Sequence, residues 1–310
     1  MRNGIINIYK EAGYTSHDVV AKMRGILKQK KIGHTGTLDP AAVGVLPVCL
    51  GKATKVCDLL TDKDKTYRCV MLLGTETDTQ DDTGQVLAKR EVTCTEQEVR
   101  AAVLAFVGDY DQVPPMYSAL KVNGQKLCDL ARAGKEVERK ARRVQIHDII
   151  IECMELPQVT MTVTCSKGTY IRTLCHDIGR KLGCGACMEH LTRTQVSDFS
   201  IEDSITLSQL EEAVREGREE SLILTVDKLF LMLPALTVKE EFQKNLENGN
   251  RIPLEALRDV DSAGMYQRPE DPISSVQARI YDYRGRFAGI YSYQQKEQDF
   301  KPVKIFWEKD

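Results

Sequence analysis

The sequence predicts an α+β fold in two parts, and three observations support this prediction. The chain has 310 residues, which exceeds the roughly 150 residues of an average domain, so two domains are expected. Segments with helical periodicity and segments with β character both occur up to about residue 233. After Pro234 short β-rich runs and turns prevail. We therefore expect a larger α+β domain at 1–233 and a small β-rich domain at 234–310.

The first third of the chain is expected to alternate strands and helices. A short strand (INIYK) precedes Thr15, which can cap a helix that ends near Lys28. The run TYRCVMLLG has the length and composition of a buried strand. Residues 95–107 predict an amphipathic helix, because Thr95 with Glu98 three residues later forms a capping box.

The middle of the chain is expected to contain two long strands followed by two helices. Pro114 and Pro115 exclude regular structure around them. The runs RVQIHDIIIECMEL and QVTMTVTCSKGTY predict strands. The helices YIRTLCHDIGRKLG and LSQLEEAVREG should end at Gly183 and Gly217, because glycine favours the C-cap. In the last part a short helix (VKEEFQKNLENG) precedes β-rich runs, and residues 283–286 predict a hairpin turn.

Composition places the chain among ordinary globular proteins, with 42% hydrophobic and 28% charged residues. No apolar stretch approaches the ~18–20 residues of a membrane span, and the N-terminal segment has no apolar signal core. We therefore expect a cytoplasmic protein that does not bind a membrane. Its ten cysteines are then expected to be reduced thiols rather than a disulfide framework.

The positive charge is concentrated in one stretch. The net charge is only −2, which argues against a dedicated nucleic-acid binder, yet the stretch from Lys121 to Arg143 has eight Lys or Arg and three acidic residues. Such a stretch can contact phosphates, or it can be a solvated charged hairpin. The residues of this stretch do not decide between the two interpretations.

One aspartate stands out in the run KIGHTGTLDPAAVGVLP. Gly33, Gly36 and Gly44 allow close approach of the backbone or a positive φ, and Pro40 holds Asp39 in an extended conformation. An isolated carboxylate on so slim a loop is accessible to a ligand. The spacing alone favours an ordinary turn residue, because Asp before Pro often begins a turn.

Other polar residues allow structural interpretations when each is considered alone. Tyr67 can be an ordinary strand aromatic. Tyr170 and Arg172 follow a strand where a helix begins, and Arg172 can be a surface arginine or part of a salt bridge. His34 is a lone histidine without a second residue at metal-ligand spacing. One C-x-x-C pair, without a second pair at zinc spacing, makes a metal site unexpected. The glycine spacing fits neither phosphate-binding motif, and no nucleophile elbow occurs. We therefore expect no metal and no cofactor.

Taken together, these motifs resemble the TruB-type tRNA pseudouridine synthases. The run GHTGTLDPAAVGVLPVCLGKATK, from Gly33 to Lys55, is similar to the catalytic motif of that family, and the segments DKTYR, LGTETDTQDDTG, VPPMYSALKVNGQ and CSKGTYIRTLCHDIG follow in the family's order. The resemblance extends over at least residues 1–200. In LTRTQVSDF the chain departs from the family, because Thr192 replaces an arginine and Ser197 stands where glycine is common.

The resemblance implies a fold and a reaction. The fold is a mixed, largely antiparallel, bent sheet flanked by helices, followed by a small β-rich tail similar to a PUA-type RNA-binding domain, in which RDVDSAGMYQRPEDPISS (about 257–275) is an enlarged loop. The reaction isomerises uridine to pseudouridine at position 55 in the T-arm loop of tRNA. It uses no cofactor, and the enzyme is expected to act as a monomer without an obligate protein partner.

The resemblance also implies roles for individual residues. Asp39 would act as nucleophile or base on the ribose, Tyr67 would stack on the flipped base, Tyr170 would accept or relay the C5 proton, and Arg172 would pair with Asp39. His34 would fill the gap left by the flipped nucleotide, and Leu191 would line the uracil pocket. Further substrate-binding residues would be Gly33, Thr35, Gly36, Leu38, Lys55 and Lys121. An RNA-contacting arm at about 115–143 would use Lys126, Arg132, Arg139, Lys140, Arg142 and Arg143.

Three rival functions follow from the same residues. An RNA-guided pseudouridine synthase shares the aspartate motif, although such proteins often carry lysine-rich tails that this chain lacks. A non-catalytic RNA-folding protein would not need the carboxylate of Asp39. An NTP-dependent enzyme is disfavoured because no phosphate loop is present.

Overall fold

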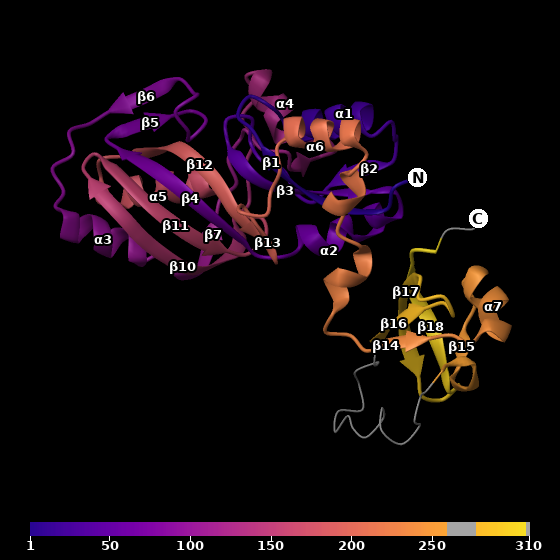
Figure 1. Ribbon diagram of the computed structural model, residues 1–310. Helices are drawn as coiled ribbons and strands as arrows, with labels where there is room; N and C mark the ends of the chain where they lie inside the picture. Colours follow the sequence, from indigo (N-terminus) through magenta and orange to yellow (C-terminus); the bar gives the residue numbers. More distant parts are fainter. Residues whose placement is uncertain (259–276, 308–310) are drawn as a thin grey trace. The chain divides into compact units, whose positions relative to one another are not determined.

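The computed structural model describes residues 1–258 and 277–307 (Figure 1). They form two compact units, one made of Met1–Ile6, Cys49–Lys55 and the described residues from Glu219 onward, and the other of Asn7–Val48 and Val56–Arg218. Within the described ranges, no helix is long and apolar enough to cross a membrane. The enlarged loop expected at about 257–275 falls outside the described residues from position 259 onward.

The larger unit is built on a mixed sheet whose strand order is β1-β3-β12-β4-β11-β10-β7. In addition, β2 pairs with β3 and β13 pairs with β12, so this sheet contains nine strands from the described residues. Strand β3 runs parallel to β12, whereas β12, β4, β11, β10 and β7 pair antiparallel. The strands are β1 (Gly4–Lys10), β2 (Ile32–His34), β3 (Val43–Leu50), β4 (Lys65–Leu73), β7 (Gly108–Gln112), β10 (Arg142–Glu155), β11 (Gln158–Cys165), β12 (Ala186–Val196) and β13 (Phe199–Ser200).

Bulges bend this sheet. In β10 the register shifts between Ile146 and Asp148 and again between Ile151 and Cys153. In β12 it shifts twice against β4. An extra residue in one strand bends that strand and increases its twist. The prediction of a bent, largely antiparallel sheet is therefore confirmed.

Helices α3 and α5 bury their apolar faces against the sheet. The core of the larger unit combines the inward residues of β4, β10, β11 and β12 with those of α3 and α5. Smaller ladders are formed by β5 (Thr75–Thr77) with β6 (Val86–Lys89) and by β8 (Lys121–Val122) with β9 (Gln125–Lys126). The helices are α1 (Ser16–Ile26), α2 (Cys57–Thr61), α3 (Glu96–Leu104), α4 (Leu127–Arg132), α5 (Ile171–Leu182) and α6 (Leu207–Glu216), with 3₁₀ turns η1 (Gly51–Val56), η2 (Glu219–Leu222) and η3 (Val226–Phe230).

The predicted N-caps and glycine C-caps are confirmed, whereas α1 ends at Ile26 and α3 at Leu104, earlier than the predicted Lys28 and residue 107. Thr15 and Thr95 each accept a hydrogen bond from the third helical N–H, and the acid at that position bonds back to the cap. Gly183 and Gly217 end α5 and α6 with φ of 80° and 72°, a left-handed conformation that favours glycine. Ser197 adopts φ 50°, which gives a physical reason why glycine suits that position better.

The C-terminal part forms a separate five-stranded sheet with the order β14-β16-β17-β18-β15. Its core contains Tyr291, Phe300 and Trp307. The predicted hairpin turn joins β16 and β17, with Gly285 at φ 81°. The elements are β14 (Ala235–Thr237), η4 (Glu240–Phe242), α7 (Gln243–Glu247), β15 (Ile252–Pro253), η5 (Leu254–Ala256), β16 (Gln277–Tyr281), β17 (Phe287–Gln294) and β18 (Asp299–Ile305). The domain boundary at 233 and the likeness to a PUA domain remain predictions.

Candidate active site

The loop that carries Asp39 joins β2 to β3 and is held close to neighbouring backbone. Gly36 and Gly44 have φ of 132° and 106°, values that a side chain disfavours. A Cβ at Gly44 would lie 2.2 Å from the carbonyl oxygen of Arg193, so glycine is required there. The Leu38 N–H donates to the Ser16 hydroxyl at 2.9 Å, which fastens the loop to α1.

Asp39 begins a turn and also presents its side chain. The Ala42 N–H donates to the Asp39 carbonyl at 3.1 Å, with Pro40 in the second position that proline favours. The carboxylate itself is 36% exposed and lies beside a guanidinium. The turn interpretation and the ligand interpretation therefore describe the backbone and the side chain of the same residue.

A buried lysine forms hydrogen bonds with backbone carbonyls of the same loop. The ammonium of Lys10 donates to the carbonyls of Ala42 at 2.7 Å and Pro40 at 3.1 Å, and the residue is fully buried. Burial lowers the pKa of Lys10 to about 8, although the nearby Asp39 opposes that shift. The sequence carried a signal for this residue, because Lys10 shares the strand face of Ile6 and Ile8.

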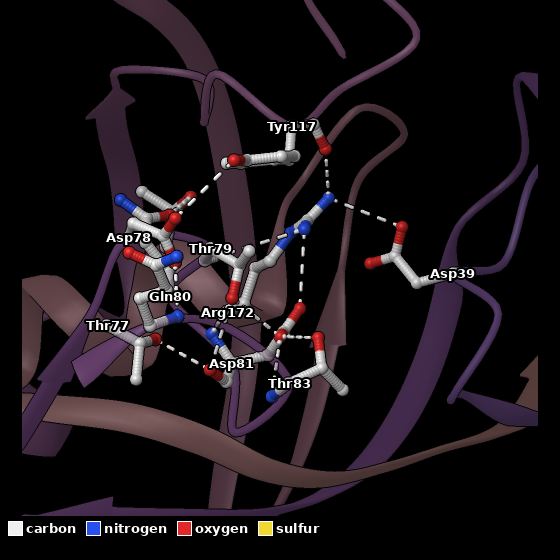
Figure 2. A network of polar contacts seen from close by, with 11 residues as sticks. Asp39, Thr77, Asp78, Thr79, Gln80, Asp81, Thr83, Tyr117 and Arg172 are labelled. Carbon is white, nitrogen blue, oxygen red and sulfur yellow. Dashed lines mark hydrogen bonds and ion pairs between the residues drawn. The ribbon is translucent and has the colours of Figure 1, made fainter. Parts of the chain in front are cut away.

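Arg172 lies between two carboxylates (Figure 2). Its Nη2 is 3.3 Å from Oδ1 of Asp39, and its Nη1 is 3.4 Å from Oδ2 of Asp81. Nη2 also donates to the carbonyl of Tyr117 at 2.6 Å. The side chain projects from the first turn of α5 and is only 6% exposed. The contact between Asp39 and Arg172 is the one that the resemblance implies.

Asp81 is held rigidly in the turn that follows β5 (Figure 2). Its Oδ1 accepts hydrogen bonds from the hydroxyls of Thr79 at 2.7 Å and Thr83 at 2.5 Å and from the Thr83 N–H at 3.1 Å. Its Oδ2 is therefore left for Arg172. Asp81 was not among the residues predicted from the sequence, although its position between Thr79 and Thr83 was a signal for a held carboxylate.

The surroundings of Asp39 disfavour its ionised form. Burial raises the pKa of the Asp39 carboxyl above its ordinary value, Arg172 opposes this, Asp81 adds to it, and Lys10 opposes it. The net shift is upward. Once ionised, such a carboxylate is a stronger base and a better nucleophile than one in water.

The two tyrosines implied by the resemblance reach this site from different elements. Tyr67 lies on β4 and is 8% exposed. Tyr170 precedes α5, where its N–H donates to Gln112 at 2.8 Å and its carbonyl accepts from Gln112 at 2.9 Å. Burial raises the pKa of both phenols, and Asp39 acts on both. Both are therefore neutral hydrogen-bond donors near Asp39 at physiological pH.

Three of the remaining expected residues, Thr35, His34 and Lys55, make side-chain contacts with backbone carbonyls of this chain. Thr35 is buried, and its hydroxyl donates to the Pro47 carbonyl at 3.1 Å. Nδ1 of His34 lies 3.0 Å from the Gly36 carbonyl, and burial lowers the pKa of His34. Gly33 lies within β2, and Leu191 on β12 packs against the core that contains Leu38 and Tyr67. Lys55 belongs to the other unit, where its ammonium donates to the Ile305 carbonyl at 2.7 Å.

The basic arm contains two kinds of cation. Arg143 is paired with Asp109 at 3.0 Å and with Asp111 at 2.9 Å. Arg139 donates to the Pro114 carbonyl at 3.1 Å, and Arg132 is 3.8 Å from Asp129. Among the described residues, the exposed cations of the arm without an ion pair are Lys121, Lys126, Lys135, Lys140 and Arg142. Within the described residues, no cluster of His, Cys, Asp and Glu could hold a metal ion.

Comparison with known proteins identifies the family. A model described as TruB family pseudouridylate synthase (N terminal domain) matches residues 24–171, and one described as tRNA pseudouridylate synthase B C-terminal domain matches residues 172–232. A tRNA pseudouridine synthase B of Lachnoclostridium phytofermentans is 53% identical, with 98% of this chain and 99% of the relative covered. One of Bacillus thuringiensis is 40% identical, with 97% and 96% covered.

Solved structures agree with this family. A chain in the structure of an H/ACA RNP bound to a substrate RNA containing 2′-deoxyuridine is 25% identical, with a TM-score of 0.69. The match covers 99% of this chain and 86% of that one. A chain of a Cbf5-Nop10-Gar1 complex is 27% identical, with the same TM-score and coverage of 98% and 85%. The predicted family and fold class are confirmed, and the chain belongs to the TruB family of pseudouridylate synthases.

Proposed function

We propose that this enzyme isomerises uridine to pseudouridine in tRNA, at position 55 of the T-arm loop. The substrate class is supported by nearly full-length likeness to proteins named tRNA pseudouridine synthase B. The observation that carries the chemistry is the partly exposed carboxylate of Asp39, held 3.3 Å from Arg172 on a loop without bulky side chains. Such a loop lets a ribose approach the carboxylate.

The reaction rearranges one nucleotide without adding or removing atoms. The C1′–N1 bond breaks, the uracil turns, C5 bonds to C1′, and the C5 proton passes to N1 by way of a base. Asp39 acts on the sugar as nucleophile or base, which its raised pKa favours once it is ionised. Arg172 keeps the carboxylate oriented. Tyr170 is the proposed acceptor or relay for the C5 proton.

The target uridine must leave its stack before it can reach Asp39. Flipping a base out of an RNA loop costs a few kcal/mol, and stacking on an aromatic ring returns about 1–3 kcal/mol. We assign that stacking to Tyr67, the lining of the uracil pocket to Leu191, and the filling of the vacated place in the RNA to His34. Burial keeps His34 neutral by lowering its pKa, which suits insertion among stacked bases.

The exposed cations of the arm are the proposed contacts to RNA phosphates, and the five-stranded tail is the proposed PUA-like RNA-binding domain. Folded RNA is recognised largely through its shape and its phosphates. We further propose that the enzyme acts in the cytoplasm as a monomer without an obligate partner. In this respect it would differ from the structural neighbours, which are chains of complexes with other components.

The test is to map pseudouridine in a full-length unmodified tRNA transcript after incubation with the purified protein. The proposal expects modification at position 55 alone, and none in a transcript in which that uridine is replaced by cytidine. Modification at another position would overturn the assigned site. Modification only after adding a guide RNA complex would favour the RNA-guided rival.

A further inference from the structure

The turn that carries Asp81 is fastened to α5 by an uncharged pair of side chains. The hydroxyl of Thr173 donates to Oε1 of Gln80 at 2.6 Å. Thr173 follows Arg172 in the first turn of α5 and is 2% exposed. A threonine hydroxyl within a helix often bonds to the carbonyl four residues earlier, whereas this one reaches a side chain of another segment. Two neighbouring residues of α5 therefore contact two neighbouring residues of the turn, because Gln80 precedes Asp81.

This uncharged contact is shorter than the charged contacts beside it. Nη1 of Arg172 lies 3.4 Å from Oδ2 of Asp81 and 3.5 Å from the Thr79 carbonyl. Both distances exceed the ordinary range for an N–H donor, whereas the distance from Thr173 to Gln80 is normal for a hydroxyl donor. Among the described residues, the bond between Thr173 and Gln80 is the shortest side-chain hydrogen bond between α5 and this turn.

Gln80 has an unusual backbone conformation, and β12 holds it there. Its φ is 65°, in the left-handed region that residues other than glycine rarely adopt. The Gln80 carbonyl accepts from the Met188 N–H at 3.0 Å, and the Met188 carbonyl accepts from the Asp82 N–H at 2.9 Å. The turn is therefore bonded to β12 through its backbone and to α5 through the Gln80 side chain. Residues held in such a conformation are concentrated at functional sites.

The rigid shape of the guanidinium connects the two carboxylates of the site (Figure 2). Nη1 of Arg172 faces Asp81 and Nη2 faces Asp39. The guanidinium is planar, so the angle between these two nitrogens is fixed. A movement of Asp81 away from α5 would therefore change the direction in which Nη2 faces Asp39.

We propose that Gln80 and Thr173 are positioning residues, which hold the carboxylate of Asp81 against the guanidinium beside the catalytic loop. The inference rests on the proposed function and extends it to two residues that do not contact the reacting atoms. Without their hydrogen bond, the side-chain contacts between α5 and this turn that remain among the described residues are the longer ones of Arg172.

Single-turnover rates and Kd values on a T-arm stem-loop test the proposal. Thr173→Val removes the hydroxyl and is expected to lower the rate by about 10- to 100-fold, with RNA affinity within about threefold of wild type. Thr173→Ser keeps the hydroxyl and should recover most of the rate. Because the pair acts through Asp81, Thr173→Val should cost less than about threefold when it is added to Asp81→Asn.

A double variant separates positioning from a purely structural role. Gln80→Gly with Thr173→Val removes both hydrogen-bonding partners, so neither is left unpaired, and glycine adopts a positive φ without strain. This double variant should unfold at about the wild-type urea concentration and still be slow. If Thr173→Val alone does not fold, the double variant takes its place in the comparison with Asp81→Asn.

Thr61→Val is the matched control. It removes a threonine hydroxyl that donates to the Cys57 carbonyl at 2.8 Å within α2, so its rate should equal wild type.

The outcomes that would overturn the inference are distinct. A wild-type rate for Thr173→Val would make the hydrogen bond dispensable, and recovery of both stability and rate in the double variant would leave the pair a structural role only. The full loss of Thr173→Val repeated in Asp81→Asn would show that the pair does not act through Asp81. A fall in RNA affinity that matches the fall in rate would assign the pair to binding. A wild type that makes no pseudouridine would instead overturn the proposed function.

Discussion

At the scale of the residue, Asp39 is placed for chemistry at the expense of stability. Its carboxyl has a raised pKa in the fold, so its ionised form destabilises the folded protein at pH values above that pKa. Asp39→Asn should therefore raise the melting temperature of the free protein at pH 7 while abolishing turnover. The gain should vanish below the ordinary carboxyl pKa of 3.8, where both states are protonated. A lower melting temperature at pH 7 would contradict this account.

The neighbours of Asp39 should move its titration in opposite directions. The single-turnover rate is expected to fall as the pH drops through the raised pKa of Asp39, because the protonated form is inactive. Asp81→Asn removes a negative charge that raises this pKa, so the acid limb should move to lower pH. Lys10→Met removes a positive charge that lowers it, so the limb should move to higher pH. Shifts of both variants in one direction would show that another group controls the limb.

At the scale of the element, the arm contains exposed cations without an ion pair and exposed cations that are already paired with acids. Reversing the charge of Lys121, Lys126 and Lys140 should weaken RNA binding and flatten its salt dependence, by about 0.7–0.9 in log–log slope for each phosphate that is no longer neutralised. Arg143→Gln should change the slope less, because Arg143 is already paired with Asp109 and Asp111. Filter binding from low to high salt would measure both slopes. An unchanged slope in the triple variant would remove the arm from the RNA interface.

The approach of β3 to β12 depends on Gly44, and Gly217 at the end of α6 is a suitable control. Gly217→Ala places a side chain in open space at φ 72° and should cost about 1–2 kcal/mol in the free energy of unfolding, the usual penalty for the left-handed region. Gly44→Ala should cost more and should also slow turnover, because its Cβ would meet the backbone of Arg193 at 2.2 Å. Urea unfolding of both variants would compare the two costs. Equal losses would mean that the strands can separate freely.

Also at this scale, the structure shows which features the sequence could reveal. The helices with Thr15 and Thr95 caps were predictable because capping is local chemistry. The strand β12 was missed because its run mixes polar residues with two bulges that interrupt the alternation. The same bulges explain why Arg193 was not recognised as a buried residue. Asp81 was missed because its partner, Arg172, lies 91 positions away in the chain.

At the scale of the whole molecule, the family could be predicted because its motifs occur in order along the chain, and the comparisons confirm it. The assembly of the site could not be predicted in the same way. Lys10, Asp39, Asp81 and Arg172 come from four separate segments that only the sheet brings together. Burial and Asp81 raise the pKa of Asp39 whereas Arg172 and Lys10 lower it, so the chemistry of Asp39 is a property of the folded unit.

The most direct test of the central claim is pseudouridine formation in a purified T-arm stem-loop, with wild type beside Asp39→Ala and no added metal, cofactor or guide. The account predicts product with wild type, none with Asp39→Ala, and RNA affinities within a few-fold of each other. Product from Asp39→Ala at the wild-type rate would contradict the role of Asp39. Absence of product from a wild type that binds the stem-loop would contradict a self-sufficient synthase.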